Sequence, residues 1–253
     1  MQRFFVAALV AAVVSGSMAE AASITPVADS FGDLSNATTT PVTFGGDGIP
    51  TSPAAISTIT TPGGNTLLLG LSATPRFEGG PGVFGGQAGT YNAFTGTNVS
   101  PSSGTVGALW NFNFFAEITL ETAGDPDEVI DDLGLILLYE FDPLPGTDDS
   151  TAGIFEISTL ASLLDPGQRV AQSSQNLNFS FLASAGTGIT PPTGVTSFDP
   201  LVTGEYSFAL RTPATGDTNL AAINVNANAV PLPLPAALLL TGLAGLAALR
   251  RFG

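Results

Sequence analysis

An alternation of apolar and polar residues with a period of two is the feature that most constrains how this chain can fold. From Trp110 to Glu121 every even-numbered position is apolar, whereas most odd-numbered positions are polar. Successive side chains of a β-strand point to opposite faces, so the pattern predicts a half-buried antiparallel strand or a bent pair of strands. The same alternation recurs in residues 176–181, 205–211 and 223–228.

Further segments complete an all-β pattern. Shorter strands are expected at Val42–Phe44, Ala55–Thr60, Thr66–Ala73 and Gly153–Ser158, and a central strand at the continuously apolar Leu133–Phe141. One short helix is expected over Ser158–Leu164, because Asp165-Pro166 ends the helical pattern there. Gly- and Pro-rich turns separate the strands, and residues 205–228 predict a terminal hairpin.

These elements predict one domain over residues 22–229, a single antiparallel β-sandwich of the jelly-roll kind. About 200 residues can fold on a hydrophobic core without disulfides, and the chain has no cysteine. No fixed-length repeat occurs, which argues against a β-helix. The Gly-, Ser- and Thr-rich residues 76–108 predict either a long surface loop with weak strands around Thr90–Thr97 or a disordered segment.

The first 21 residues have the features of a signal peptide. Arg3 supplies a positive start, the apolar run Phe4–Val14 follows, and small residues come next. Ser17 and Ala19 fit the small-x-small cleavage site, so we expect cleavage after Ala19, with Ala21 as the alternative. The apolar run is too short to span a hydrocarbon core of about 30 Å. Export by the Sec machinery and removal of residues 1–21 by signal peptidase are therefore expected.

Residues 230–253 form a second distinct segment with three parts. The first is a proline-rich lead containing Val230, Pro231, Pro233 and Pro235. The second, Ala236–Leu249, is uncharged and rich in helix formers, and as a helix it is only about 21 Å long. The third is the basic pair Arg250 and Arg251, which favours a cytoplasmic position for the C-terminus while the rest of the chain lies outside.

This order of proline motif, apolar helix and basic end resembles the VPLPA-CTERM sorting signal, a variant of the PEP-CTERM class on exported proteins of Gram-negative bacteria. The resemblance covers only this C-terminal tail, and an extra Leu234-Pro235 unit interrupts the motif. Either Val230–Pro233 or Leu232–Ala236 could be the recognised unit. The resemblance implies transient anchoring in the inner membrane, recognition by a membrane-embedded exosortase, and delivery to the cell surface or extracellular matrix.

Charge and composition exclude several kinds of function. All but one of the 21 acids lie between the two terminal segments, where they face only Arg76, Arg169 and Arg211. Such an acidic body repels phosphate backbones, so nucleic acid is not an expected partner, whereas polysaccharide or divalent cations are compatible with it. The chain has no histidine, cysteine or lysine. It therefore lacks the usual base of a serine nucleophile, thiol catalysis, thiolate metal sites and Schiff-base chemistry.

A cluster of acids is the candidate metal site. Asp125, Asp127, Asp131 and Asp132 fall within eight residues, as does Glu128. Calcium prefers several oxygen ligands from loops, so these aspartates are a speculative calcium site, although their spacing fails the EF-hand pattern. The competing interpretation is a solvated acidic loop without a metal, and no other cofactor is expected.

Carboxylates on strands are the remaining source of catalytic chemistry. The candidates are Glu117, Glu121, Glu140, Glu156 and Glu205. A glycosidase needs two carboxylates roughly 5–9.5 Å apart across a groove. Alternation explains Glu117, Glu121 and Glu205 as residues of a solvated face, whereas Glu140 lies among apolar residues, where an unpaired charge is costly.

Two hypotheses of different classes follow. The first is a non-catalytic structural or adhesive protein of the cell envelope, cell surface or extracellular matrix, with no catalytic residues. The second is a secreted carbohydrate-binding module or a carboxylate-dependent glycoside-active enzyme, either of which could be assisted by calcium. Convergence of two carboxylates in a groove beside an aromatic platform distinguishes an enzyme from the other readings.

Overall fold

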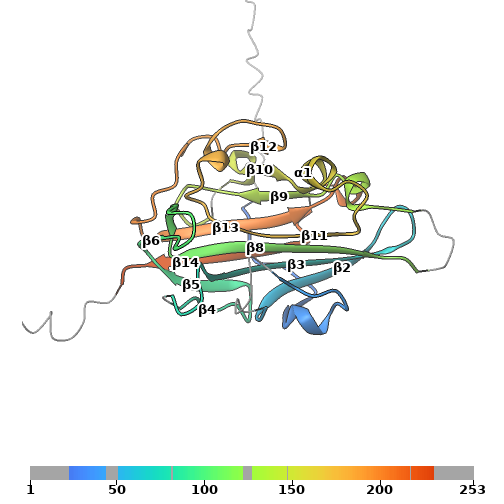
Figure 1. Cartoon of the computed structure of the whole chain (residues 1–253), viewed down its shortest axis with the longest axis horizontal. Coiled ribbons are helices and arrows are strands. Elements are labelled where there is room, and N and C mark those ends of the chain that lie inside the picture. The colour runs from blue at the N-terminus through green and yellow to red at the C-terminus, as the bar shows by residue number, and fades with distance from the viewer. Residues whose placement is uncertain are drawn as a thin grey trace, which may run out of the picture.

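The computed structural model describes residues 23–43, 51–80, 82–121, 127–146, 148–216 and 218–230. The predicted signal peptide, its cleavage site at Ala19, and the sorting segment beyond Val230 lie outside these residues. β-strands are the predominant regular structure of the described residues (Figure 1). Within the described ranges, no helix is long and apolar enough to cross a membrane.

A five-stranded antiparallel sheet forms one layer, in the order β1-β2-β3-β8-β11. Its strands are β1 (Ser30–Gly32), β2 (Ala54–Thr60), β3 (Thr66–Pro75), β8 (Trp110–Thr119) and β11 (Val170–Gln175). The long alternating segment is confirmed as the single strand β8, which pairs with β3 along its whole length. The predictions for Ala55–Thr60 and Thr66–Ala73 are also confirmed.

A seven-stranded sheet forms the second layer, in the order β12-β10-β9-β13-β14-β5-β4. Its strands are β12 (Ile189–Thr190), β10 (Gly153–Glu156), β9 (Ile136–Tyr139), β13 (Gly204–Arg211), β14 (Ala221–Asn228), β5 (Thr90–Phe94) and β4 (Phe84–Gly85). The predicted terminal hairpin is confirmed as β13–β14. β14 pairs with β5 in parallel, however, so the expectation of wholly antiparallel sheets is wrong at this one pair.

Short elements connect the two sheets. The hairpin of β6 (Thr97–Val99) and β7 (Val106–Ala108) forms a small third sheet, so residues 76–108 contain four short strands. The predicted helix is α1 (Ile157–Leu164). The described residues also form five 3-10 helices: η1 (Leu34–Asn36), η2 (Ile130–Leu133), η3 (Asp149–Thr151), η4 (Ser180–Ala183) and η5 (Pro213–Thr215).

The two sheets share one hydrophobic core. Phe112 of β8 stacks on Phe208 of β13 with ring centroids 4.6 Å apart, and both are fully buried. Trp110 meets Phe208 edge to face at 6.2 Å. The same cluster takes in apolar side chains of β3, β9 and β14, so both sheets bury their inner faces against it.

Segments before β2 cover part of the outer faces. Leu34 and Val42 pack against Phe115 on the outer face of the five-stranded sheet. Ile24 packs against Leu138 and Ala209 on the outer face of the seven-stranded sheet. These contacts explain why strands with alternating sequences are buried on both faces along much of their length.

The strand predicted within residues 176–181 is wrong. The strand in this region is β11, which lies earlier in the chain and ends at Gln175. The next residue, Asn176, is fully buried, and its side chain hydrogen-bonds to the backbone beside β8. Its amide accepts from the Ala108 backbone N–H at 2.9 Å and donates to the carbonyls of Ala108 at 3.1 Å and Trp110 at 2.8 Å. Leu177 is then buried as part of a turn that leads into η4.

Two smaller predictions also need correction. The strand expected over Gly153–Ser158 ends at Glu156, because α1 begins at Ile157. Val42 and Thr43 are not in a strand, and Phe44 lies outside the described residues. In their place, Pro41 and Thr43 hydrogen-bond to the Gln172 side chain on β11, so this segment is held by contacts that local sequence does not reveal.

Candidate functional site

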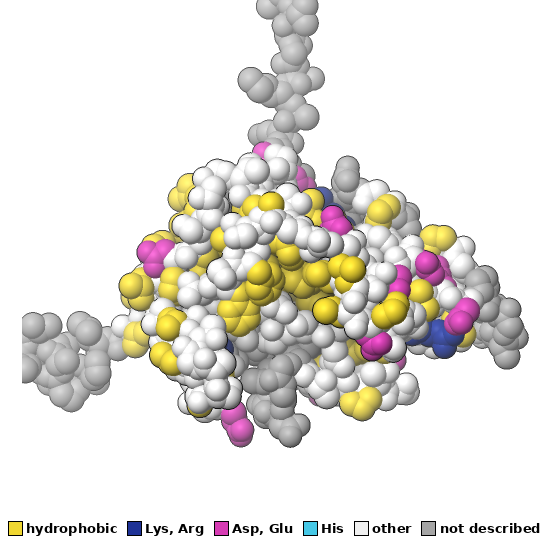
Figure 2. All heavy atoms as spheres, turned by 45° about the horizontal axis from the view of Figure 1, so that its top comes forward, with side chains coloured by type: hydrophobic (Ala, Val, Ile, Leu, Met, Phe, Trp, Pro, Cys, Tyr) yellow, Lys and Arg dark blue, Asp and Glu magenta, His cyan; other side chains and the backbone are white. Residues whose placement is uncertain are grey.

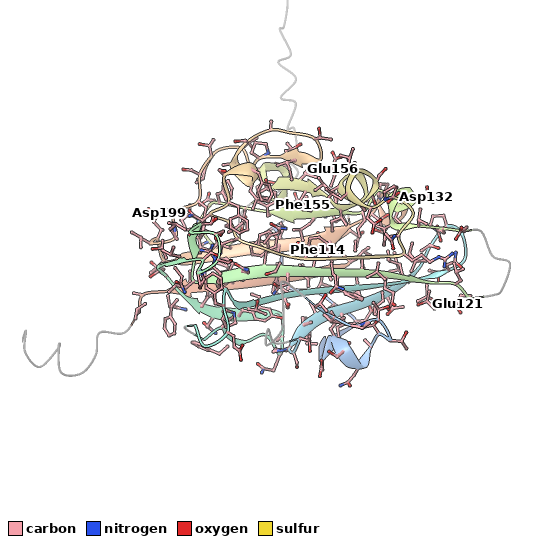
Figure 3. The ribbon with its side chains drawn as sticks, in the orientation of Figure 1. Phe114, Glu121, Asp132, Phe155, Glu156 and Asp199 are labelled. Carbon is pink, nitrogen blue, oxygen red and sulfur yellow. The ribbon has the colours of Figure 1, made fainter. Side chains whose placement is uncertain are left out.

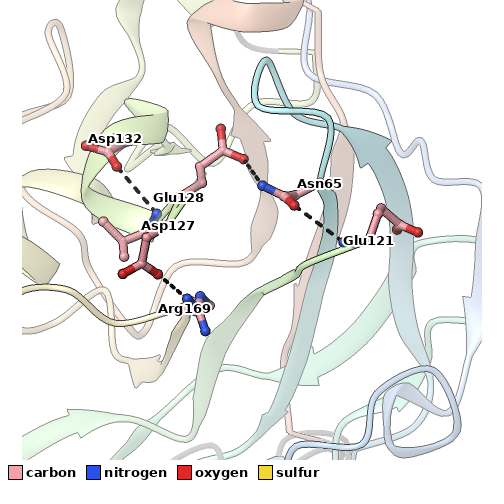
Figure 4. A network of polar contacts seen from close by, with 7 residues as sticks. Asn65, Glu121, Asp127, Glu128, Asp132 and Arg169 are labelled. Carbon is pink, nitrogen blue, oxygen red and sulfur yellow. Dashed lines mark hydrogen bonds and ion pairs between the residues drawn. The ribbon is translucent and has the colours of Figure 1, made fainter. Parts of the chain in front are cut away.

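The predicted calcium ligands lie near η2, and each of the described aspartates forms an ion pair or a hydrogen bond with another residue of the chain. Asp127 forms an ion pair with Arg169, and its side chain is 82% exposed. Asp131 accepts from the Gly167 N–H at 3.1 Å. Asp132 accepts from the Val129 N–H at 3.4 Å (Figure 4). Asp125 lies outside the described residues. No three acidic side chains in the described part of the chain are grouped to hold a metal, and the calcium site stays a prediction.

Glu128, in the middle of the same acidic cluster, connects it to the β2–β3 turn. Its Oε2 accepts from the Asn65 side-chain amide at 3.0 Å (Figure 4). Oε2 also accepts from the Thr61 hydroxyl, and Oε1 accepts from the Gly63 N–H at 3.3 Å. Burial acts to raise the pKa of Glu128, but the three hydrogen bonds together lower it below the ordinary value. Glu128 therefore stabilises the β2–β3 turn through Asn65, which is 63 residues away in the sequence. Its position in the acidic cluster did not indicate this role.

Glu128→Ala is expected to destabilise the protein at neutral pH by about 1–3 kcal/mol, because Thr61 and Asn65 lose a charged acceptor. The lowered folded-state pKa means that the stabilisation is complete above the unfolded pKa of about 4.3 and is lost as the pH falls through the folded value. Denaturant unfolding at pH 7 and near pH 3 measures this difference. The exposed Glu78→Ala is the control, and an equal effect of both substitutions at pH 7 contradicts the prediction.

Strand carboxylates accept hydrogen bonds mainly from threonine. Glu117 accepts from the hydroxyls of Thr38 and Thr40, and Glu121 accepts from that of Thr66. Glu117 is only 9% exposed, so the expectation that it lies on a solvated face is wrong: residues 38–40 cover it. In a body without lysine, neutral hydroxyl donors satisfy these charges.

Two further candidate carboxylates also accept hydrogen bonds, Glu140 just after β9 from the neighbouring strand β13 and Glu156 from the first turn of α1. Glu140 is 2% exposed and accepts from the Ser207 N–H at 2.7 Å. Glu156 accepts from the Thr159 hydroxyl at 2.7 Å. Each of these acids thus stabilises the turn, strand or helix start beside it.

An apolar groove opens where the edges of the two sheets approach each other, and we call it the edge groove. It consists of two adjoining hollows of about 340 and 440 Å³ that share Phe155, Leu160, Leu164 and Gln175. Its other lining residues come from β8, from α1 through the following turn to β11, and from η4 through to β12: Phe114, Ile157, Ala161, Asp165, Gln168, Val170, Ala171, Gln172, Ser173, Phe181, Ser184, Ala185, Gly186, Thr187 and Ile189.

Two phenylalanines bring the sheets together in the edge groove. Phe114 of β8 and Phe155 of β10 have ring centroids 5.7 Å apart and ring planes tilted by 56° (Figure 3). A band of hydrophobic side chains is visible across this face of the molecule (Figure 2). Asp165 is the single acid among the described lining residues.

A second, more polar hollow lies on the outer face of the seven-stranded sheet, and we call it the amide hollow. It measures about 360 Å³ and is lined by Asn92, Asn226, Asn228, Glu205 and Thr203, together with Pro143, Pro145, Gly204 and Ala227. Strand register explains the grouping, because Asn226 lies opposite Glu205 on one side and opposite Asn92 on the other. Sequence alternation predicted that Glu205, Asn226 and Asn228 lie on the polar face of their strands, but it did not predict that they lie beside Asn92.

The sorting residues are described only at their start. β14 ends at Asn228, and Val230 is 55% exposed. Pro231, Pro233, Pro235, Arg250 and Arg251 lie outside the described residues. Comparison of the chain with protein-family models, with curated proteins and with solved structures gives no match.

Proposed function

We propose that this chain is an exported, non-catalytic structural or adhesive protein that an exosortase-type enzyme delivers to the cell surface or extracellular matrix of a Gram-negative bacterium. The observation that carries the proposal is the three-part tail of residues 230–253, together with its placement. The last strand of the described residues ends at Asn228, and the tail starts at an exposed Val230. A membrane enzyme could reach a motif that begins just beyond the folded body.

The carboxylates support a non-catalytic role. Glu117, Glu121 and Glu156 accept from threonine hydroxyls. The edge groove has one lining acid, Asp165, and the amide hollow has one, Glu205, among the residues described. Hydrolysis of a glycosidic bond needs two carboxylates on opposite sides of the sugar. A role in binding or in building a surface layer needs no such pair.

We also propose a specific fold class, a jelly-roll-like β-sandwich. A core shared by two sheets supports a sandwich, and we keep the jelly-roll-like class as a prediction. The hairpins β2–β3, β9–β10 and β13–β14 each stay within one sheet, a feature of up-and-down arrangements that supports the sandwich but not its jelly-roll connectivity. A stable body of this kind suits a surface protein that has no disulfides.

Fractionation of the native host tests the proposal. We expect the wild-type protein in the outer envelope or matrix fraction, and the triple variant Pro231→Ala, Pro233→Ala and Pro235→Ala in the inner membrane, because the enzyme loses its motif. The matched control is Pro101→Ala, an exposed turn residue that is far from the tail in sequence. If the triple variant reaches the same fraction as wild type, the sorting role is wrong.

The amide hollow favours one second candidate, a carbohydrate-binding module. Three amide side chains, one carboxylate and a threonine hydroxyl offer both donors and acceptors to sugar hydroxyls. Asn228 donates to the Asn226 carbonyl at 2.9 Å, which fixes one wall of the hollow. This candidate shares the exported location of the first and differs only in having a defined ligand.

A further inference from the structure

The edge groove has an uncharged wall, which is unusual for so acidic a chain. The chain carries a net charge of −15, yet no charged residue occurs from Val170 to Phe198. This stretch supplies β11 and the segment from Phe181 to Ile189, both of which line the edge groove. Like-charged surfaces repel each other, so this wall is a place where another acidic molecule can approach closely.

Among the described residues, no backbone hydrogen bond occupies the outer edge of β11, and residues 41–43 contact Gln172 through its side chain. β11 is the outermost strand of its sheet and has six residues, whereas the other sheet-edge strands β1, β4 and β12 have two or three. The Ile118 N–H donates to the Arg169 carbonyl at 2.8 Å. Because hydrogen-bonded and non-bonded pairs alternate in an antiparallel ladder, the N–H and C=O groups of Val170, Gln172 and Ser174 point away from β8. β11 also lacks the charges and prolines that usually block edge pairing.

Two exposed leucines end α1, and the second of them, Leu164, lines the edge groove. Leu163 is 60% exposed and Leu164 is 83% exposed, and Leu164 contributes to both hollows. The same patch therefore carries an apolar hollow and an apolar projection. A surface that contains both is complementary to itself, which is what an interface with a two-fold axis requires.

We infer that a second copy of this chain binds the edge groove. β11 of one copy pairs antiparallel with β11 of the other, and Leu164 of each copy enters the groove of its partner. Pairing of the outward backbone groups places the two-fold axis at Gln172, with Val170 opposite Ser174 of the other copy. The five-stranded sheet then continues from one copy into the next. This inference goes beyond the proposed function and does not depend on export.

Ionic strength distinguishes this partner from a charged one. Two copies of net charge −15 repel each other outside the uncharged wall, so added salt screens the repulsion and strengthens their association. A cationic partner held by the acidic surface is released by salt instead. We expect the dimerisation constant to rise between about 50 mM and about 500 mM sodium chloride, and a fall contradicts the inference.

Sedimentation velocity of the purified full chain, combined with hydrogen exchange, tests the inference. Leu164→Glu is expected to weaken dimerisation at least about tenfold, because the partner's groove then has to receive a charge. Leu201→Glu is the matched control, since Leu201 is 68% exposed and lies outside the edge groove; it is expected to dimerise like wild type. Amide exchange of residues 170–175 is expected to slow as the wild-type concentration rises.

Three results overturn the inference. The first is a wild-type chain that stays monomeric, which leaves the groove to a different occupant such as an extended peptide or a neutral polymer. The second is equal association of the Leu164→Glu and Leu201→Glu variants, which places the contact elsewhere, including the apolar terminal segments that both variants retain. The third is exchange of residues 170–175 that is independent of concentration, which excludes pairing through β11.

Discussion

Raising the pH above about 10 is expected to unfold this protein steeply, because all three of its tyrosines are buried. Burial raises the pKa of Tyr206 to about 12, with further contributions from Asp199, Asp142 and Glu140. Burial raises the pKa of Tyr91 and Tyr139 even more. Their hydroxyls donate to the carbonyls of Pro53 at 2.6 Å and Leu182 at 2.7 Å, contacts that need the protonated form.

The sign follows from proton counting. In the unfolded chain each tyrosine loses its proton near pH 10, whereas the folded chain keeps all three. Between about pH 10 and pH 12 the unfolded state thus binds up to three fewer protons, and the free energy of unfolding falls as the pH rises. At about 1.4 kcal/mol per proton and pH unit, the loss approaches roughly 4 kcal/mol per pH unit.

Tyrosinate absorbance and Trp110 fluorescence, followed together through an alkaline titration, measure this effect. We expect the two signals to change in one cooperative transition, and Tyr206→Phe to lower the steepness by about a third. A tyrosine that titrates near pH 10 while the fluorescence remains native contradicts the burial of that side chain.

Phe112→Ala is expected to destabilise the protein by about 3–5 kcal/mol. Phe112 is fully buried, and its ring stacks on Phe208 of the facing sheet at 4.6 Å. Removing the ring leaves a cavity between two sheets whose backbones are fixed by their hydrogen bonds, so the site can collapse only in part. Both the buried apolar area and the contact between sheets are lost.

Chemical denaturation compares Phe112→Ala with Phe84→Ala. Phe84 is 52% exposed, and its ring contacts Phe94 at 5.9 Å within the seven-stranded sheet. The control is expected to cost less than about 1 kcal/mol, in keeping with a partly exposed side chain. If the two variants lose similar stability, Phe112 does not join the two sheets in the way described.

Sequence pattern predicted the strands that are half buried or fully buried in the core. β8 was found because its inner side chains Phe112 and Phe114 alternate with polar ones. β11 was missed because its inner residues Ala171, Ser173 and Gln175, which line the edge groove, are small or polar. A strand that lines a groove has no need of large apolar residues, so it carries no periodic signal.

The candidate sites depend on contacts between distant segments, which local patterns cannot reveal. The edge groove joins Phe114 to Phe155, and Glu128 reaches Thr61 and Asn65. The parallel pairing of β14 with β5 is likewise a property of the whole sheet. The acidic cluster is evident in the sequence as a run of closely spaced acids, but the sequence does not show that Asp127 forms an ion pair with Arg169.

Intact-mass measurement of the protein recovered from its native host tests the central claim of export and sorting most directly. The account predicts a chain that begins after Ala19 and has lost part or all of residues 230–253, recovered from the envelope or the medium. A full-length chain from Met1 to Gly253 in the cytosol would contradict both terminal signals and the proposed function with them.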